Sequence, residues 1–189
     1  MSVRRLLAAL LLVTALGSCT TGGENLPTGA DPERADARLE RQRRDVRAAA
    51  RTMLEDAERR LPGRTTHSSG GWRGCDSVGI EQYKNFRYLA QAGVDVGAGA
   101  AGPPLSALHA VLEDAGFTAA EVSPGLGGGD STSLAGRHRE LTAVFSGIGG
   151  TSVGPVIGLD VYGPCVDVPE GDRDAWLRRE ETTPDLLAR

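Results

Sequence analysis

Three glycines in the stretch VDVGAGAAGPP, at positions 97, 99 and 102, have the spacing G-x-G-x-x-G. This spacing is typical of a dinucleotide site when a helix starts within the glycines, because the helix amides then meet the pyrophosphate. Here Pro103 and Pro104 follow the last glycine directly. Their rings would clash inside the second turn of such a helix and remove hydrogen bonds. We therefore expect a glycine-rich loop before the helix, and no nicotinamide site.

Other residues that could carry catalysis are far apart in the sequence. His67, His109 and His138 form no H-E-x-x-H pattern, and no serine stands in G-x-S-x-G. The glycine stretch at 125–130 is not followed by the Gly-Lys-Ser/Thr of a phosphate-binding loop. We expect no catalytic residue, no metal site and no bound cofactor.

Cys75 and Cys165 form a distant pair. In an oxidising compartment an even pair indicates a disulfide. The alternative is a metal or redox pair, but a metal site needs more ligands than two thiols, and the chain has no C-x-x-C. A bridge would close a loop of about 90 residues and stabilise the fold by about 4–5 kcal/mol. It would also bring Asp76 toward Asp160 or Asp167, either as a cation-binding carboxylate cluster or as plain exposed turn residues.

The N-terminus has the order of a secretory signal. Two arginines precede an apolar run, Leu6 to Leu16, which is shorter than the roughly 20 residues that span a bilayer. The run ends in LGSC, which resembles the cleavage box of bacterial lipoproteins. That resemblance implies removal of residues 1–18 and diacylation of Cys19, whereas an ordinary signal peptide would make this cysteine incidental. Because two acyl chains anchor a protein stably, we expect it on the outer face of the cytoplasmic membrane, in the cell envelope.

Composition limits the partners. The formal net charge of −4 argues against nucleic-acid binding, which needs a dense basic surface. Lys84 is the only lysine, and with abundant alanine, glycine and arginine this bias favours a GC-rich bacterium. Arginines and acids are concentrated in residues 34–64. We interpret this segment as a solvated helix face, with contact to anionic lipid headgroups beside the anchor as the alternative.

One long helix is expected over residues 32–61. Asp31 followed by proline is a helix start, and Pro62-Gly63 is a stop. An apolar stripe runs along the second half of this helix, and the first half is expected to be polar all round. A second helix is expected from Pro103 to Ala115, and a short one after Asp172.

Strand patterns follow the first helix and recur after the second. They cover residues 64–72, 82–96, 117–123, 139–149 and 153–165, and we expect the last two to pair as antiparallel neighbours. This order predicts an α+β fold, with an antiparallel sheet of about four strands and two main helices on one face. The predicted organisation is a signal peptide (1–18), a lipidated flexible tether (19–31), a single domain (32–168) and a C-terminal tail (169–189).

The order of these features resembles small actinobacterial lipoproteins of the LppA type. The shared features are the LGSC box, the long first helix, a cysteine in WRGC after the first strand, a second helix ending in a glycine-aromatic step (LSALHAVLEDAGF), and a late strand closing on VYGPC. The resemblance implies an envelope lipoprotein with no known enzymatic activity.

The function we expect is non-catalytic binding or scaffolding of a partner, an envelope protein or a lipid, by a domain held at the membrane through its lipid anchor. One alternative is a carrier of a small ligand or lipid, with a groove between the second helix and the sheet. Another is an envelope hydrolase, which requires polar groups converging in a cleft.

Overall fold

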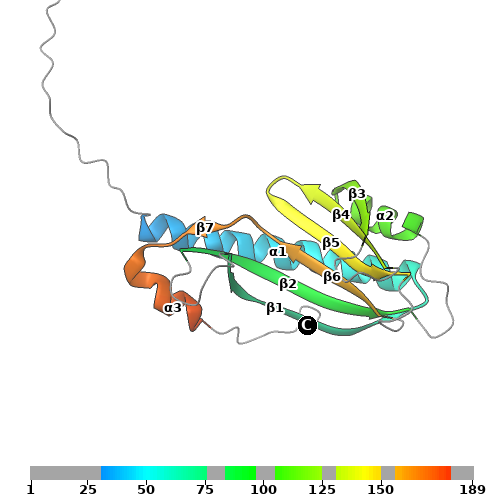
Figure 1. The fold of residues 1–189 in the computed structure, drawn as a ribbon, viewed down its shortest axis with the longest axis horizontal. Helices are drawn as coiled ribbons and strands as arrows, with labels where there is room; N and C mark the ends of the chain where they lie inside the picture. Colours follow the sequence, from blue (N-terminus) through cyan, green and yellow to red (C-terminus); the bar gives the residue numbers. More distant parts are fainter. Residues whose placement is uncertain (1–30, 76–83, 97–104, 125–130, 150–155, 180–189) are drawn as a thin grey trace, which may run out of the picture.

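The computed structural model describes residues 31–75, 84–96, 105–124, 131–149 and 156–179. These residues form three α-helices and a seven-stranded antiparallel open sheet, so the protein has the α+β fold that the sequence predicts (Figure 1). The signal peptide and Cys19 lie outside the described residues, as does the tether up to residue 30.

Helix α1 (Pro32–Arg60) begins and ends where local chemistry directs it. The Asp31 carboxylate accepts hydrogen bonds from two N–H groups of the first turn, at 3.1 and 3.4 Å. Pro32 takes the first helical position, where no N–H is needed. Pro62 follows the last turn, so the predicted helix 32–61 is confirmed to within one residue.

The first half of α1 is not polar all round, so this expectation is wrong. Ala35, Leu39 and Gln42 are buried there, and Leu39 is completely buried. These positions extend the apolar stripe of the second half at three- and four-residue steps. The sequence signal for this half of the stripe is weak, because its apolar side chains are few. They are covered in part by strand β7 (Val166–Asp167), which lies near the other end of the chain.

The sheet follows the order β1-β2-β6-β5-β4-β3, and the two-residue strand β7 pairs beside β6 on β2. Besides β7, the strands are β1 (Arg64–Gly74), β2 (Asn85–Asp95), β3 (Thr118–Pro124), β4 (Thr132–His138), β5 (Leu141–Ile148) and β6 (Val156–Tyr162). Antiparallel pairing of β5 with β6 confirms the predicted neighbours. All neighbouring strands pair in the antiparallel sense.

Seven strands correct the expected four or so. Strand β4 was missed because its sequence, TSLAGRH, has one large apolar side chain, Leu134, and no strong alternation. Its other core-facing position is Gly136, where an added Cβ would lie 3.2 Å from the Leu112 side chain. Glycine lets the helix approach this strand closely without moving Leu112, and it weakens the strand's own sequence signal.

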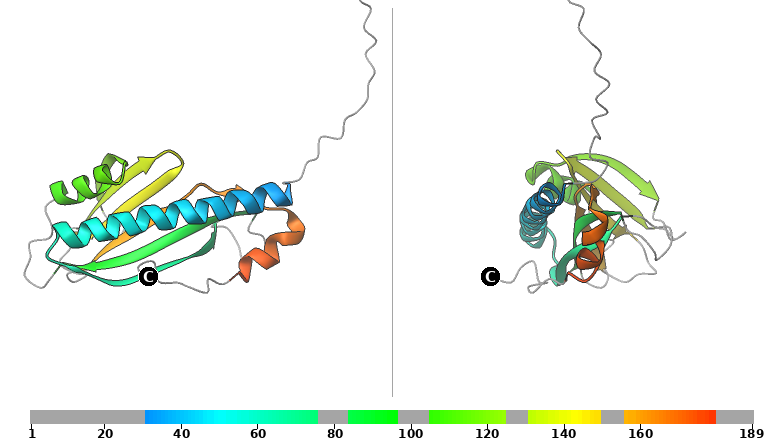
Figure 2. Two further views of the ribbon diagram at one scale, coloured as in Figure 1. Left: turned by 180° about the vertical axis from the view of Figure 1, so that it is seen from behind. Right: turned by 90° about the vertical axis from the view of Figure 1, so that its left-hand side faces the viewer.

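Two of the helices share one face of the sheet, and α1 lies lengthwise across it (Figure 2). Helix α1 contacts β2 and β6, while α2 (Leu105–Asp114) contacts β3, β4 and β5. Helix α3 (Arg173–Leu177) follows a 3-10 turn, Glu170–Asp172. Its Trp176 meets Trp72 of β1 edge-on at 4.7 Å between ring centroids, so the segment after residue 168 contributes to the core.

The other face of the sheet carries half-buried polar and small side chains. On it, Gln91 donates from Nε2 to Asp160 Oδ1 at 3.0 Å, and the Arg87 guanidinium lies 4.4 Å from the centre of the Tyr162 ring. These side chains pair across neighbouring strands, as is common in antiparallel sheets.

A disulfide joins Cys75 and Cys165, with their Cα atoms 6.1 Å apart, as the sequence predicts. Cys75 follows the end of β1, and its N–H donates to the Asn85 carbonyl on β2. Cys165 lies in the short irregular stretch between β6 and β7. The bridge therefore joins the end of the edge strand β1 to residues 163–165, which separate the two strands, β6 and β7, that pair with the same side of β2.

Candidate functional site

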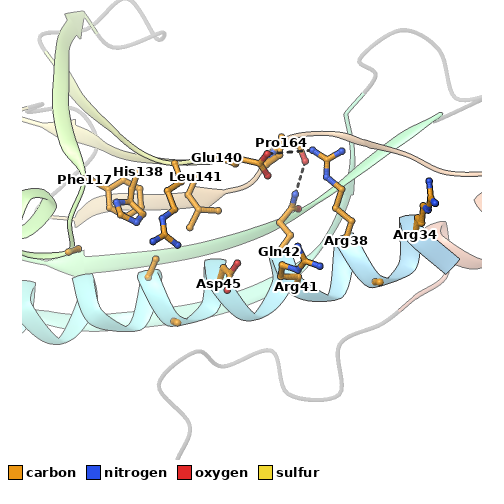
Figure 3. A pocket seen from close by; sticks show the side chains of 15 residues that line it. Arg34, Arg38, Arg41, Gln42, Asp45, Phe117, His138, Glu140, Leu141 and Pro164 are labelled. Carbon is orange, nitrogen blue, oxygen red and sulfur yellow. Dashed lines mark hydrogen bonds and ion pairs between the residues drawn. The ribbon is translucent and has the colours of Figure 1, made fainter. Parts of the chain in front are cut away.

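A groove of about 720 Å³ runs between the first half of α1 and the β4–β5 turn (Figure 3). The α1 side chains that line it follow helical spacing: Arg34, Ala37, Arg38, Arg41, Gln42, Asp45, Ala48 and Ala49. The turn contributes residues 138–141, and Ala115, Phe117 and Pro164 complete the lining. The volume is within the range of small-molecule sites, about 300–1,000 Å³.

The α1 wall changes character along its length. Arginines predominate in its first part, at positions 34, 38 and 41, alanines occupy its last part, at 48 and 49, and Asp45 lies between the two parts. Phe117 and Leu141 also line the groove and add apolar surface to it. At 1.5 Å per residue, the wall from position 34 to position 49 is about 22 Å long.

The opposite wall is the tip of the β4–β5 hairpin. His138 pairs with Leu141, so the connecting loop has only two residues, Arg139 and Glu140. Arg139 has a φ of 52°, in the left-handed region, and among the described residues it is the one non-glycine with positive φ. The first central position of such a turn normally favours glycine.

Charges of both signs meet in the groove, with arginine in excess. Arg38 forms an ion pair with Glu140 at 3.8 Å, which links α1 to the hairpin (Figure 3). Arg34 pairs with Asp31 at 3.2 Å. Within the part of the chain that the structure describes, Arg41 and Arg139 have neither an ion pair nor a hydrogen-bond acceptor.

Gln42 fixes one side of the groove. Its Nε2 donates to the Pro164 carbonyl at 2.7 Å, and its Oε1 accepts the Tyr88 N–H at 2.6 Å. Tyr88 lies on β2 between the residues that pair with β7 and those that pair with β6. At this gap in the pairing, the Gln42 side chain accepts the Tyr88 N–H in place of a strand carbonyl. Gly163 leaves room for it, because a Cβ there would lie 2.3 Å from the Gln42 side chain.

A second hollow, of about 540 Å³, lies between the start of α1 and α3. Its main cation, Arg179, lies 4.2 Å from the centre of the Trp176 ring and 5.3 Å from that of Trp72. The same guanidinium binds Asp36, at 3.3 Å, and Glu40. Since these partners already satisfy Arg179, the hollow is chiefly a joint between the two helices.

The sequence-predicted histidines lie on three different elements. His67 is on β1 beside the Thr66 hydroxyl, at 3.1 Å, and His109 is half-buried on α2. His138 ends β4 and lines the groove, with its Nδ1 2.6 Å from the Gly116 carbonyl oxygen. The structure therefore brings one of the three to the groove and does not bring them together.

Two members of the suggested carboxylate cluster, Asp160 and Asp167, are described, and they lie apart on the sheet. Asp160 lies opposite Gln91 on β2, and Asp167 lies opposite Asn85. Six residues of strand correspond to about 20 Å, so the two carboxylates are far apart. Asp76 lies outside the described residues, as do the glycine loops at 97–102 and 125–130.

A carrier is expected to have its groove between α2 and the sheet. The observed groove lies elsewhere, between α1 and the β4–β5 hairpin. Between α2 and the sheet, Leu108, Val111 and Leu112 are fully buried. The sequence signal for the actual groove is the row of arginines on α1, a pattern that by itself favours a solvated helix face. The hairpin that faces this row was not predicted, so nothing in the sequence placed a second wall opposite it.

The described residues contain no group of three or more His, Cys, Asp or Glu side chains placed to hold a metal ion. None of the described helices is both long and apolar enough to cross a bilayer. Comparison of the chain with protein-family models, curated proteins and solved structures finds no match.

Proposed function

We propose that this protein is a lipid-anchored lipoprotein of the cell envelope whose folded domain binds a partner without catalysing a reaction. The observation that carries the binding role is the groove between α1 and the β4–β5 hairpin, which is open, of ligand size and lined by side chains of contrasting character. The anchor is Cys19, at the end of the LGSC box. The layout shared with LppA-type lipoproteins supports the same role.

The anchor would place the groove close to the membrane. Twelve residues separate Cys19 from Pro32 at the start of α1, and an extended chain of this length reaches at most about 40 Å. The arginine part of the groove begins in the first turn of α1, at Arg34. On this proposal the protein sits on the outer face of the cytoplasmic membrane, with the bilayer as one partner and an envelope protein or lipid as the other.

A carrier of a small ligand or lipid is a second candidate. The groove volume, about 720 Å³, favours it, because this volume lies in the range of small-molecule sites. A carrier differs from a scaffold in that its ligand travels with the purified protein.

The anchor is tested by the mass of the mature N-terminal peptide. We expect a peptide that begins at Cys19 and carries acyl chains, and a Cys19→Ser protein that is neither acylated nor cleaved before position 19. A Cys75→Ser chain serves as the control, because it loses a cysteine but keeps the lipidation site. An unmodified N-terminus at Met1 in the parent, or an acylated N-terminus in the Cys19→Ser protein, would contradict the proposal.

A further inference from the structure

We propose that the α1–hairpin groove binds a monomeric anionic amphiphile, a molecule with a phosphate or carboxylate group and an apolar chain. Arg41 and Arg139 hold the anion, and the chain lies along the alanine end of α1. This inference rests on the proposed binding role and names its ligand class. It does not depend on the lipid anchor.

The groove attracts anions although the whole chain is acidic. Its lining includes four arginines, at positions 34, 38, 41 and 139, against two carboxylates, Asp45 and Glu140. The chain as a whole has a formal charge of −4. A local excess of guanidinium groups in a concave surface concentrates the field and selects anionic ligands. Guanidinium also matches the geometry of carboxylate and phosphate oxygens.

Arg41 and Arg139 are the cations best placed to receive a ligand. They line opposite walls, one from α1 and one from the hairpin, and neither has a partner among the described residues. The Arg38–Glu140 pair offers further capacity. Its side chains are 53% and 70% exposed, so the pair contributes little to stability and a stronger anion can displace the glutamate.

The backbone of Arg139 supports a role beyond folding. The residue has a φ of 52°, a conformation that L side chains avoid and glycine adopts without strain. Glycine would therefore suit this turn better than arginine. An arginine kept in a strained turn, with its position lining a groove and no partner among the described residues, indicates that the side chain serves a ligand.

The other end of the groove suits an apolar chain. Ala48 and Ala49 on α1 lie in the same lining as Phe117 and Leu141. From Arg41 to Ala49 the helix rises about 12 Å. An acyl chain that crosses one leaflet spans about half of the 30 Å bilayer core, or about 15 Å, so a medium-length chain matches this end.

Calorimetric titration of the full chain carrying Cys19→Ser tests the ligand class. The probes are dodecyl phosphate below its micelle concentration, inorganic phosphate, and dodecanol. We expect one dodecyl phosphate per chain, bound at least tenfold more tightly than either of the other two probes. Equal affinity for dodecyl phosphate and inorganic phosphate would overturn the proposed site for the alkyl chain. Equal affinity for dodecyl phosphate and dodecanol would overturn the proposed site for the anion.

Variants locate the site and separate binding from folding. Arg139→Gly should weaken dodecyl phosphate binding at least tenfold while raising the melting temperature, because it removes a ligand contact and relieves the turn. Arg41→Ala should weaken binding similarly. Arg44→Ala is the matched control, since Arg44 is an exposed α1 arginine outside the groove lining, and it should bind as the parent does. Unchanged binding by Arg139→Gly, or equal losses in Arg44→Ala and Arg41→Ala, would overturn the assignment.

Vesicles distinguish a free amphiphile from a bilayer. The same Cys19→Ser chain is mixed with neutral phospholipid vesicles, with and without an anionic phospholipid. Arginine-dependent binding to anionic vesicles, without binding to monomeric dodecyl phosphate, would replace the proposed ligand by a membrane surface. If neither binds while the mature N-terminus proves lipidated, the ligand class is wrong and the anchored binding role remains.

Discussion

At the scale of single residues, the buried amide of Gln42 joins three parts of the fold. It is 6% exposed, and its two hydrogen bonds reach a strand of the sheet and the Pro164 carbonyl next to the disulfide. A buried amide satisfied on both sides specifies how α1 lies on the sheet, because any shift of the helix would leave polar groups without partners.

Gln42→Met keeps the volume of the side chain but removes both hydrogen bonds. The Tyr88 N–H and the Pro164 carbonyl would then lose their partner, at about 1–3 kcal/mol each. We expect the free energy of unfolding, measured by urea titration, to fall by about 3 kcal/mol. Arg44→Ala, on the exposed side of the same helix, should change it by less than about 0.5 kcal/mol. A Gln42→Met chain as stable as its parent would show that the amide does not fix α1.

Glu58 should account for part of the loss of folding stability in acid. The Thr65 hydroxyl and backbone N–H, which face its carboxylate, hold the pKa of Glu58 below its ordinary value of 4.5. Because the folded-state pKa is depressed, this contribution to stability is present above pH 4.5 and is lost as the pH falls through the lowered pKa.

Glu58→Gln should therefore reduce stability at neutral pH and flatten the loss of stability below pH 4.5. Urea midpoints of parent and variant, measured across this pH range, should converge as the pH falls. Glu55→Gln provides a control at an exposed carboxylate on the same helix. A constant difference between Glu58→Gln and its parent at every pH would contradict the assigned cause.

Local residue chemistry was the most predictable part of this protein. The Asp31 cap follows from residue type and position, and the Cys75–Cys165 bridge follows from an even cysteine pair together with the predicted signal sequence, which would place the chain in an oxidising compartment. The role of Gln42 does not, because its partners lie 46 and 122 positions away along the chain. A polar residue on the apolar stripe was the available signal, and it indicates a buried partner without identifying it.

At the scale of elements, α3 is held by packing. A five-residue helix is too short to be stable alone, so its order depends on Trp176, which contacts Trp72 and Phe86, and on Arg179, which binds α1. The sequence places a short helix here, but its contacts join residues from opposite ends of the chain.

Trp176→Ala should detach α3. The two tryptophans of the chain meet edge-on at 4.7 Å, so their coupled near-ultraviolet circular dichroism should disappear in this variant. Removal of a buried tryptophan costs about 3–5 kcal/mol when the whole fold depends on it, and less when only the helix detaches. Arg178→Ala, which removes an exposed pair with Asp174, should leave the spectrum unchanged. Persistence of the coupled signal in Trp176→Ala would contradict the observed packing.

Strands differed in how well the sequence revealed them. Strands β5 and β6 alternate large apolar residues and were predicted, with their pairing. Strand β4 packs under α2 through Leu134 and Gly136, and a glycine chosen for close helix contact gives no hydrophobic signal. Because β4 forms one side of the hairpin at the groove, the same missing signal concealed the site.

At the scale of the whole molecule, one disulfide ties the sheet edge to the wall of the groove. Cys165 is adjacent to Pro164, which lines the groove and accepts the hydrogen bond from Gln42. The bridge spans a sequence separation of 90 residues, so it restricts a large part of the unfolded chain.

The double variant Cys75→Ser/Cys165→Ser should lose about 4–5 kcal/mol of unfolding free energy. It should also bind dodecyl phosphate more weakly, because the Pro164 wall loses one of its two fastenings. Guanidinium titration and calorimetry measure the two effects. The oxidised parent treated with a thiol-alkylating reagent is the control and should be unaffected. Equal stability of the variant and the parent would contradict a bridge that supports the fold.

The most direct test of the central claim is hydrogen–deuterium exchange of the Cys19→Ser full chain with and without dodecyl phosphate. A ligand in the groove should slow backbone exchange in residues 34–49 of α1 and in residues 138–141 of the hairpin. The backbone amides of β2 and β6 should exchange at their original rate. Protection confined to β2 and β6, with the α1 and hairpin segments unchanged, would place binding elsewhere and contradict the account.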